Sequence, residues 1–134
     1  MFNQDLPLHE EVPPELTPLR EPTFFILLVL SKGRKHGYAI LKDVQALSEG
    51  RVVLSTGTLY GALARLMKQG VIRKSSHDGG EDRSGSKSRI GNADIRVRKY
   101  YELTQFGRRV LDAEINRMGT ILAAVSKELG EEGI

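Results

Sequence analysis

The sequence predicts a mainly α-helical fold of the α+β kind, in which three helices form a core, two strands form a hairpin and a fourth helix follows. Three observations predict it. Apolar residues form one unbroken run and three helically spaced patterns, two short β-like segments flank a Gly- and Ser-rich loop, and a heptad pattern lies toward the C-terminus. The chain has 134 residues, 40% hydrophobic and 28% charged, a composition typical of one globular domain.

The composition excludes several classes of protein. Because the chain has no cysteine, it has no disulfides and no thiolate metal sites, which fits a reducing compartment. The longest apolar run, Phe24 to Leu30, is far shorter than the roughly 20 residues that span a bilayer. Acidic residues precede the first lysine or arginine, Arg20, unlike the pattern of a secretory signal. We therefore expect a cytoplasmic protein without a membrane partner.

The N-terminal residues 1–18 contain four of the five prolines, so we expect an arm that is flexible or packs late, with one short helical turn at most. Pro22 then suits the first turn of a helix that runs to about Leu30. This helix is apolar on every face, which requires burial in the core and against something else, and a partner chain is the simplest candidate. A buried strand remains the alternative, because an unbroken apolar run has no period.

Two further helices follow a polar turn at residues 31–37. The first carries a helical apolar pattern and ends near Ser48 to Gly50; its apolar positions are Ile40, Leu41, Val44 and Leu47. The second has Ser55 or Thr56 as its cap and Gly70 as a left-handed stop. Its buried stripe is Leu59, Leu63, Leu66 and Met67, and its opposite face carries Thr58, Gly61, Arg65 and Lys68. This third helix is therefore apolar on one side and polar or basic on the other.

Residues 71–75 and 97–103 have the composition of two strands, and together they form the predicted hairpin. Between them lies a long loop, residues 77–96, which is rich in Gly and Ser and carries Arg83, Lys87, Arg89 and Arg96. Thr104 then caps the last helix. We expect residues 19–103 to form one compact domain and residues 104–134 to form a separate C-terminal helix.

The last helix has the most regular pattern in the chain. Its apolar residues are spaced 4, 3, 4, 3 and 4 apart, at Leu111, Ile115, Met118, Leu122, Val125 and Leu129. Such a heptad seam requires a facing helix, and a second copy of the chain is its simplest source. The alternative is an ordinary amphipathic helix that packs back on its own domain.

Charge is unevenly distributed along the chain. The net charge is +3, yet residues 1–19 carry four acids and no base, and residues 20–76 carry ten bases against three acids. A strongly basic block in one small domain favours a polyanionic partner, most commonly nucleic acid. The alternative is that these side chains only solvate helix faces.

No constellation of residues points to catalysis or to a bound metal or cofactor. The three histidines, His9, His36 and His77, lie in different segments without metal-ligand spacing. The segment 80–88 is similar to a phosphate loop, but its lysine falls one position late and no helix follows. We therefore expect a protein that is not an enzyme.

This order of elements is typical of a compact DNA-binding domain, in which the second helix supports the third and the third enters the major groove. The long loop then reaches the phosphate backbone or the minor groove, where its arginines release counterions. The basic residues expected along the phosphates are Lys42, Arg65, Lys68, Arg73 and Lys74. A protein-interaction module, whose basic face meets an acidic protein, remains the alternative function.

Four motifs resemble the PadR family of bacterial transcriptional regulators, and the likeness extends from about Leu19 to Leu129. They are LREPTF at 19–24, HGYAI at 36–40, GTLYGALARL at 57–66 and YYELTQFG at 100–107. The resemblance implies a winged helix-turn-helix homodimer that binds double-stranded operator DNA, usually as a repressor, and is released by a small effector. It also implies that the first and last helices build the dimer, as in the compact branch of that family.

By motif position the resemblance assigns DNA contacts to Tyr38, Thr58 and Tyr60, and the charge and heptad patterns add the other expected residues. The DNA-binding residues that we expect are Tyr38, Lys42, Thr56, Thr58, Tyr60, Arg65, Lys68, Arg83, Lys87 and Arg89. The dimerisation residues that we expect are Phe24, Phe25, Leu28, Leu111, Ile115, Met118, Leu122, Val125 and Leu129. Two features depart from the family pattern. The loop at 77–96 is longer than a minimal wing, and the absence of tryptophan excludes an effector pocket built on a tryptophan at the dimer interface.

Overall fold

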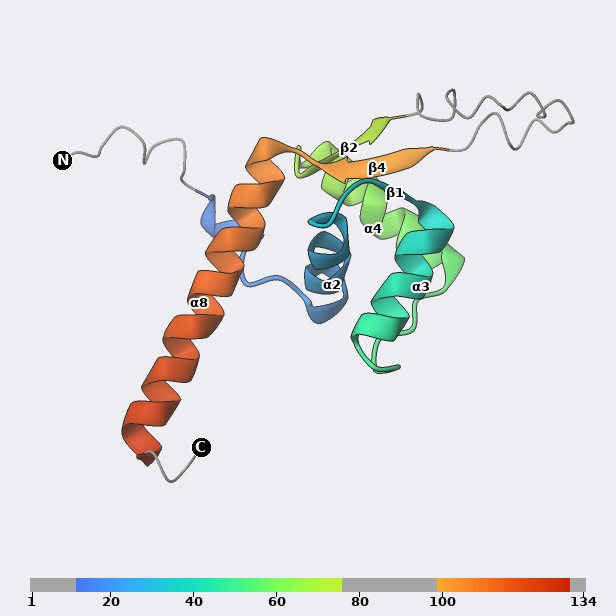
Figure 1. Ribbon diagram of the computed structural model, residues 1–134. Coiled ribbons are helices and arrows are strands. Elements are labelled where there is room, and N and C mark those ends of the chain that lie inside the picture. The colour runs from blue at the N-terminus through green and yellow to red at the C-terminus, as the bar shows by residue number, and fades with distance from the viewer. Residues whose placement is uncertain (1–11, 76–98, 131–134) are drawn as a thin grey trace, which may run out of the picture.

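The computed structural model describes residues 12–75 and 99–130, and in these ranges the predicted mainly helical fold is confirmed. In chain order the elements are η1 (Pro14–Leu16), α2 (Glu21–Leu30), β1 (Lys35–His36), α3 (Gly37–Leu47), α4 (Thr56–Lys68), β2 (Ile72–Ser75), β4 (Tyr100–Leu103) and α8 (Gln105–Leu129). Three helices, α2, α3 and α4, pack together beside a small sheet, and α8 starts at the sheet and extends beyond them (Figure 1).

The sheet has three antiparallel strands in the order β1, β4, β2, whereas the sequence predicted only two. The additional strand is β1, in the segment that was expected to be a turn, where Lys35 pairs with Tyr101 and His36 with Tyr100. A strand of two residues shows no alternation, so its sequence could not reveal it. The predicted hairpin itself is confirmed, with Ile72 opposite Leu103 and Ser75 opposite Tyr100.

The core lies where α2, α3 and α4 meet the sheet. In α2, Ile26, Leu27, Val29 and Leu30 are buried, which confirms the prediction that this apolar segment is a helix rather than a strand. The remaining apolar residues of α2, namely Phe24, Phe25 and Leu28, are half-buried in the single chain. The helix is therefore covered by its own domain on part of its surface only.

The ends of α4 follow the predicted signals. The Ser55 hydroxyl accepts a hydrogen bond from the Thr58 backbone N–H at 3.1 Å, which satisfies one free N–H of the first turn. Gly70 has φ +77° and ends the helix as a left-handed residue. The N–H groups of Gly70 and Val71 donate back to Met67 and Leu66, in the pattern of a Schellman motif. Both ends of α4 are thus fixed by backbone geometry.

The long helix α8 has two different halves. In its first half, Val110, Leu111 and Glu114 are buried against the domain. In its second half the apolar residues are exposed, namely Ile115, Met118, Ile121, Leu122, Val125 and Leu129. Leu111 was expected in the dimer seam, but it is 1% exposed and belongs to the core of its own chain, so the free seam starts at Ile115.

The described part of the N-terminal arm, from Val12 onward, packs on the domain and contains the one short turn, η1. Its anchor is Glu114, whose carboxylate is 1% exposed and accepts a hydrogen bond from the Leu19 N–H at 3.2 Å. Arg117 donates to both carboxylate oxygens, at 2.9 and 2.8 Å. The hydrogen bond from Arg117 lowers the pKa of Glu114, burial opposes that effect, and the Leu19 N–H adds to it. Glu114 is therefore a buried anion that joins the arm to α8.

Replacement Glu114→Gln is expected to lower the free energy of unfolding at pH 7 by about 2 kcal/mol, because it removes the charge that Arg117 and Leu19 bind. Since folding lowers the pKa of Glu114, its stabilisation is complete above the ordinary glutamate pKa of about 4.3 and is lost as the pH falls through the lower folded-state value. Urea unfolding of both proteins between pH 3 and 7 should therefore show a shallower acid limb for the variant. Glu128→Gln, a replacement of an exposed residue on the same helix, should give the same dependence of stability on pH as the original protein.

Candidate nucleic-acid interface

Helix α4 separates an apolar side from a polar one, as predicted. Leu59, Leu63 and Leu66 are buried in the core. The polar or basic residues of the other side are exposed, namely Thr56, Thr58, Arg65 and Lys68. Gly61 lies among them with open space around its Cα, so a surface can approach the helix backbone there. This side of α4 is the natural candidate to face a polyanion.

Tyr60 is held in place by two contacts. Its ring packs edge-on against the buried Tyr101 of β4, with 6.5 Å between ring centroids. Its hydroxyl lies over the backbone of Gly37, where a Cβ would come within 2.1 Å of the oxygen. The Tyr60 side chain nevertheless remains 44% exposed. Burial of Tyr101, with a smaller contribution from Tyr60, raises the pKa of the Tyr101 phenol, so Tyr101 is a neutral support at physiological pH.

The start of α3 adds a second pair of residues to the same region. Tyr38 follows Gly37 directly and is 64% exposed, and the Lys42 ammonium lies 5.5 Å from the centre of its ring. This cation–π contact orients one positive charge at the exposed end of α3. Since Gly37 lies against Tyr60, the structure places the start of α3, with Tyr38, next to Tyr60 of α4.

Replacement Gly37→Ala is expected to displace the Tyr60 ring while the fold survives, because the clash at 2.1 Å is with the tip of a side chain that can rotate. Affinity for DNA should fall by about tenfold if that ring reads the duplex. Anisotropy titration against an operator fragment measures the affinity, and the near-ultraviolet circular dichroism of the tyrosines reports the displacement. In a Tyr60→Ala background the same replacement should have no further effect on affinity. Losses of affinity that add in the double variant would contradict an action of Gly37 through Tyr60.

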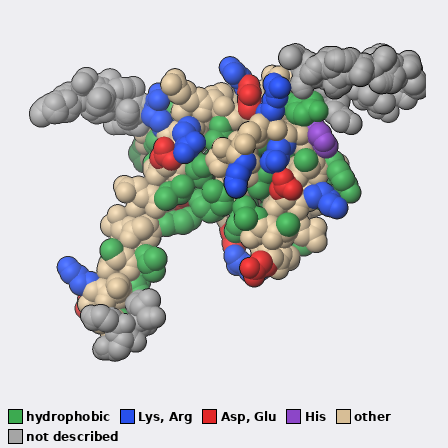
Figure 2. Space-filling model, viewed as in Figure 1, with side chains coloured by type: hydrophobic (Ala, Val, Ile, Leu, Met, Phe, Trp, Pro, Cys, Tyr) green, Lys and Arg blue, Asp and Glu red, His purple; other side chains and the backbone are tan. Residues whose placement is uncertain are grey.

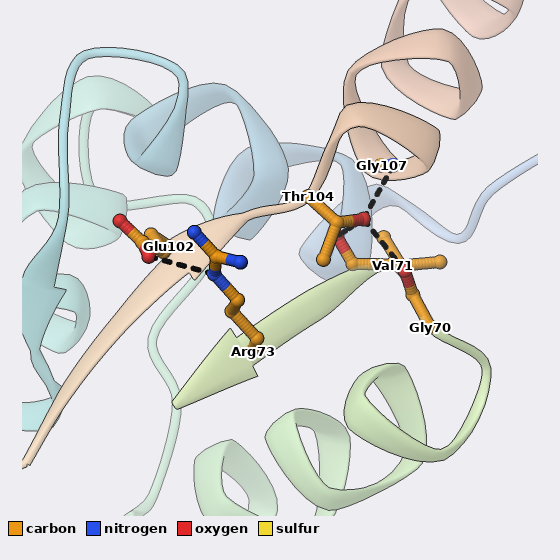
Figure 3. A network of polar contacts seen from close by, with 6 residues as sticks. All are labelled: Gly70, Val71, Arg73, Glu102, Thr104 and Gly107. Carbon is orange, nitrogen blue, oxygen red and sulfur yellow. Dashed lines mark hydrogen bonds and ion pairs between the residues drawn. The ribbon is translucent and has the colours of Figure 1, made fainter. Parts of the chain in front are cut away.

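The strands place basic residues beside α4, but not all of them are free. Arg73 was expected along the phosphates, yet its guanidinium pairs with Glu102 on the facing strand at 2.8 Å (Figure 3). Lys74 next to it is exposed. Arg34, which directly precedes β1, lies 5.7 Å from the centre of the Tyr100 ring and adds a positive charge beside the sheet. The predicted loop residues Arg83, Lys87, Arg89 and Arg96 lie outside the described residues.

Thr104 connects the end of α4 to the start of α8 (Figure 3). Its hydroxyl donates to the Gly70 carbonyl at 2.6 Å, with the Val71 carbonyl at 3.1 Å, and accepts from the Gly107 N–H at 2.9 Å. The Thr104 N–H also donates to the Val71 carbonyl, at 3.0 Å. The Thr104 side chain thus joins the carbonyl of Gly70, the residue that ends α4, to the first turn of α8. The predicted cap at Thr104 is confirmed.

The described residues offer little for other chemistry. Within residues 12–75 and 99–130, no group of three or more His, Asp and Glu side chains is placed to hold a metal ion. Among the helices in these ranges, none is long and apolar enough to cross a membrane. Figure 2 shows lysine and arginine side chains spread over the sheet and the helices beside it, whereas hydrophobic side chains gather over α2 and along α8.

Comparison with known proteins agrees with this geometry. The model of the transcriptional regulator PadR-like family matches residues 26–113, which is most of the chain. The chain belongs to the PadR-like family. The matched range covers the second half of α2, all of α3 and α4, the sheet and α8 as far as Ala113. It omits the N-terminal arm, the first five residues of α2 and the whole exposed half of α8. Membership makes the chain a transcriptional regulator by family, and DNA is the partner that its exposed basic side fits.

Solved PadR-like structures are similar to this chain along most of its length. A PadR family transcription regulator from Clostridium difficile is 27% identical, with a TM-score of 0.60 over 83% of this chain and 100% of that one. A PadR family regulator from Eggerthella lenta is 26% identical, with a TM-score of 0.55 over 81% and 84%. A transcriptional regulator from Clostridium thermocellum, at 24% identity and a TM-score of 0.58 over 79% and 87%, shares the fold. Comparison with curated proteins gives no match.

Proposed function

We propose that this PadR-like protein is a homodimeric, sequence-specific repressor that places α4 in the major groove of operator DNA and is released by a small-molecule effector. One observation carries the DNA contact: α4 buries one side in the core and exposes Thr58, Arg65 and Lys68 on the other. Such a helix, supported by α3, has the geometry of a recognition helix. Operator DNA implies action in the cytoplasm.

The proposed DNA-contacting set follows the positions of the side chains. Thr58 and Tyr60 lie in the first turns of α4, where a recognition helix reaches base edges. Lys42, Arg65 and Lys68 supply positive charge for phosphates on either side. Tyr38, Thr56 and the loop residues Arg83, Lys87 and Arg89 complete the proposed set. Phosphate contacts fix the position of the helix, and the few base contacts determine the sequence.

The proposed dimer uses the apolar surface that the single chain leaves open. Leu122 and Leu129 on α8 are 62% and 57% exposed, and residues 115–129 keep the heptad spacing. The half-buried apolar residues of α2, namely Phe24, Phe25 and Leu28, extend this surface. A two-fold dimer would present two α4 helices about 34 Å apart, one turn of DNA.

Fluorescence anisotropy across a salt series tests the function directly. The probes are a fragment from upstream of the protein's own gene and an unrelated fragment of equal length. We expect tighter binding to the upstream fragment that persists at physiological salt. Equal binding to both fragments that disappears with salt would contradict a sequence-specific regulator and would favour a module that binds acidic proteins.

Replacements Arg65→Ala and Tyr60→Ala are each expected to weaken operator binding about tenfold or more, because each removes a side chain that α4 presents to the duplex. Anisotropy measures the affinity and circular dichroism checks the fold. Lys127→Ala, which removes one exposed charge near the end of α8, is the matched control and should bind as the original protein does. Unchanged affinity in both α4 variants would remove this helix from the mechanism.

A further inference from the structure

A cavity of about 410 Å³ lies between the N-terminal arm, the start of α2, the C-terminal part of α4 and the first half of α8. This volume is within the range of small-molecule sites. Aliphatic side chains form part of its wall, including Leu16, Leu66 and Val110, and none of the described residues that line it is aromatic. The wall from the arm is held by the hydrogen bond between Leu19, itself a lining residue, and Glu114. The cavity therefore exists because the arm packs on the domain.

Two arginines of this cavity differ from the other described arginines. The described ranges contain eight arginine side chains, and six of them have a partner: Arg34, Arg51, Arg73, Arg108, Arg109 and Arg117. In the same ranges the two without a side-chain partner are Arg20 and Arg65, and both line the cavity. Glu15 also lines it and pairs with neither. Among the described lining residues the charged side chains, Glu15, Arg20 and Arg65, sum to +1, which a monoanion would neutralise.

We propose that this cavity binds a short aliphatic carboxylate, whose charge pairs with Arg20 and Arg65 and whose chain lies on the aliphatic wall. A carboxylate accepts paired hydrogen bonds from a guanidinium, and the described part of the wall has no aromatic ring on which a planar ligand could stack. Thr23 also lines the cavity and adds a hydroxyl donor.

The consequence for DNA rests on the proposed function. Arg65 lines the cavity and also lies on the exposed side of α4 that we propose faces DNA. One guanidinium cannot pair fully with a carboxylate and a DNA phosphate at once. The bound carboxylate therefore weakens DNA binding, and by linkage DNA weakens carboxylate binding by the same factor. Arg20, which is outside the proposed DNA-contacting set, serves the carboxylate alone.

The first test measures carboxylate binding without DNA. The ¹⁵N-labelled full chain is titrated with hexanoate, and with hexanamide as the neutral analogue, at ionic strength held constant with chloride. We expect saturable shifts at residues 15–23 and 65–71 with hexanoate, and none with hexanamide. Arg20→Ala should weaken hexanoate binding about tenfold or more, Glu15→Gln should strengthen it, and Lys127→Ala should leave it unchanged. Absent saturation, equal binding of hexanamide, or shifts confined to residues 115–129 would overturn the proposal.

The second test measures the link to DNA. Hexanoate at constant ionic strength should lower the affinity for the upstream fragment in the original protein. Arg20→Ala should bind that fragment with full affinity and lose the response. Sequence-specific binding that hexanoate leaves unchanged would overturn the link to DNA and leave the proposed function intact. Hexanoate binding in a protein that shows no sequence preference would keep the site and reject the proposed function, so the two failures are distinguishable.

Discussion

Replacement Gly107→Ala is expected to lower the free energy of unfolding by about 3 kcal/mol. A Cβ at this position would come within 1.9 Å of the Val71 carbonyl oxygen and 2.9 Å of its carbon. These are backbone atoms, and the same carbonyl accepts the Thr104 N–H, so neither the strand nor the helix can move without breaking the cap. The first turn of α8 would separate from the end of α4. Chemical denaturation measures the loss.

Gly57→Ala is the matched control for this prediction. Gly57 also lies in the first turn of a helix, and a Cβ there would meet nothing within 4 Å. Alanine favours the helix over glycine by roughly 0.5–1 kcal/mol, so this variant should be as stable as the original protein or more stable. Equal destabilisation by both replacements would indicate a general effect on helix starts, and an unchanged stability of Gly107→Ala would contradict the close contact.

Replacement Leu122→Glu is expected to convert the proposed dimer to a monomer and to weaken operator binding by about 100-fold. Leu122 is 62% exposed in the single chain, so its own domain does not depend on it. In a heptad seam, however, the charge would face an apolar partner helix. A monomer loses the second half-site, and with it the effective concentration that linkage provides, which is worth about 10²–10⁴ in affinity. Light scattering measures the mass and anisotropy the affinity.

Thr120→Glu carries the same charge on the same helix, at a position that faces away from the seam. Thr120 is exposed and lies two residues from Leu122, nearly on the opposite side of α8. This variant should stay dimeric and bind the operator fully. A dimer that survives Leu122→Glu would show that the exposed seam of α8 is not the interface, and a monomer from both variants would show only that α8 tolerates no added acid.

Local patterns in the sequence predicted the elements that depend on neighbours along the chain. The apolar period of α4, its Ser55 cap and its Gly70 stop are all local, and each is confirmed. The heptad of α8 predicted a helix as far as Leu129, but it did not show that the first half is buried in the core and the second half is exposed. Leu111 joins the core because α8 crosses the domain there, and spacing alone cannot distinguish an internal contact from an external one.

Contacts between distant segments were not predictable. The strand β1 exists only because Tyr100 and Tyr101 pair with it. Gly37 indicated a special backbone position, but nothing in the sequence pointed to Tyr60 as the group that lies against it. Glu114 lies between the apolar positions of the α8 heptad, so the pattern gives no sign of its role. That role depends on Leu19, 95 residues away. The pairing of Arg73 with Glu102 likewise depends on the strand register, which the sequence alone does not give.

The hydrogen bonds of Thr104 have a further consequence for the kind of operator that the protein accepts. Because this side chain ties the end of α4 to the start of α8, we expect each half of the proposed dimer to move as a rigid unit. Binding by such a dimer would depend on the spacing of the two half-sites along the turn of the duplex as well as on their bases. Insertion of about five base pairs between the half-sites would turn one of them to the far side of the DNA, beyond its reach.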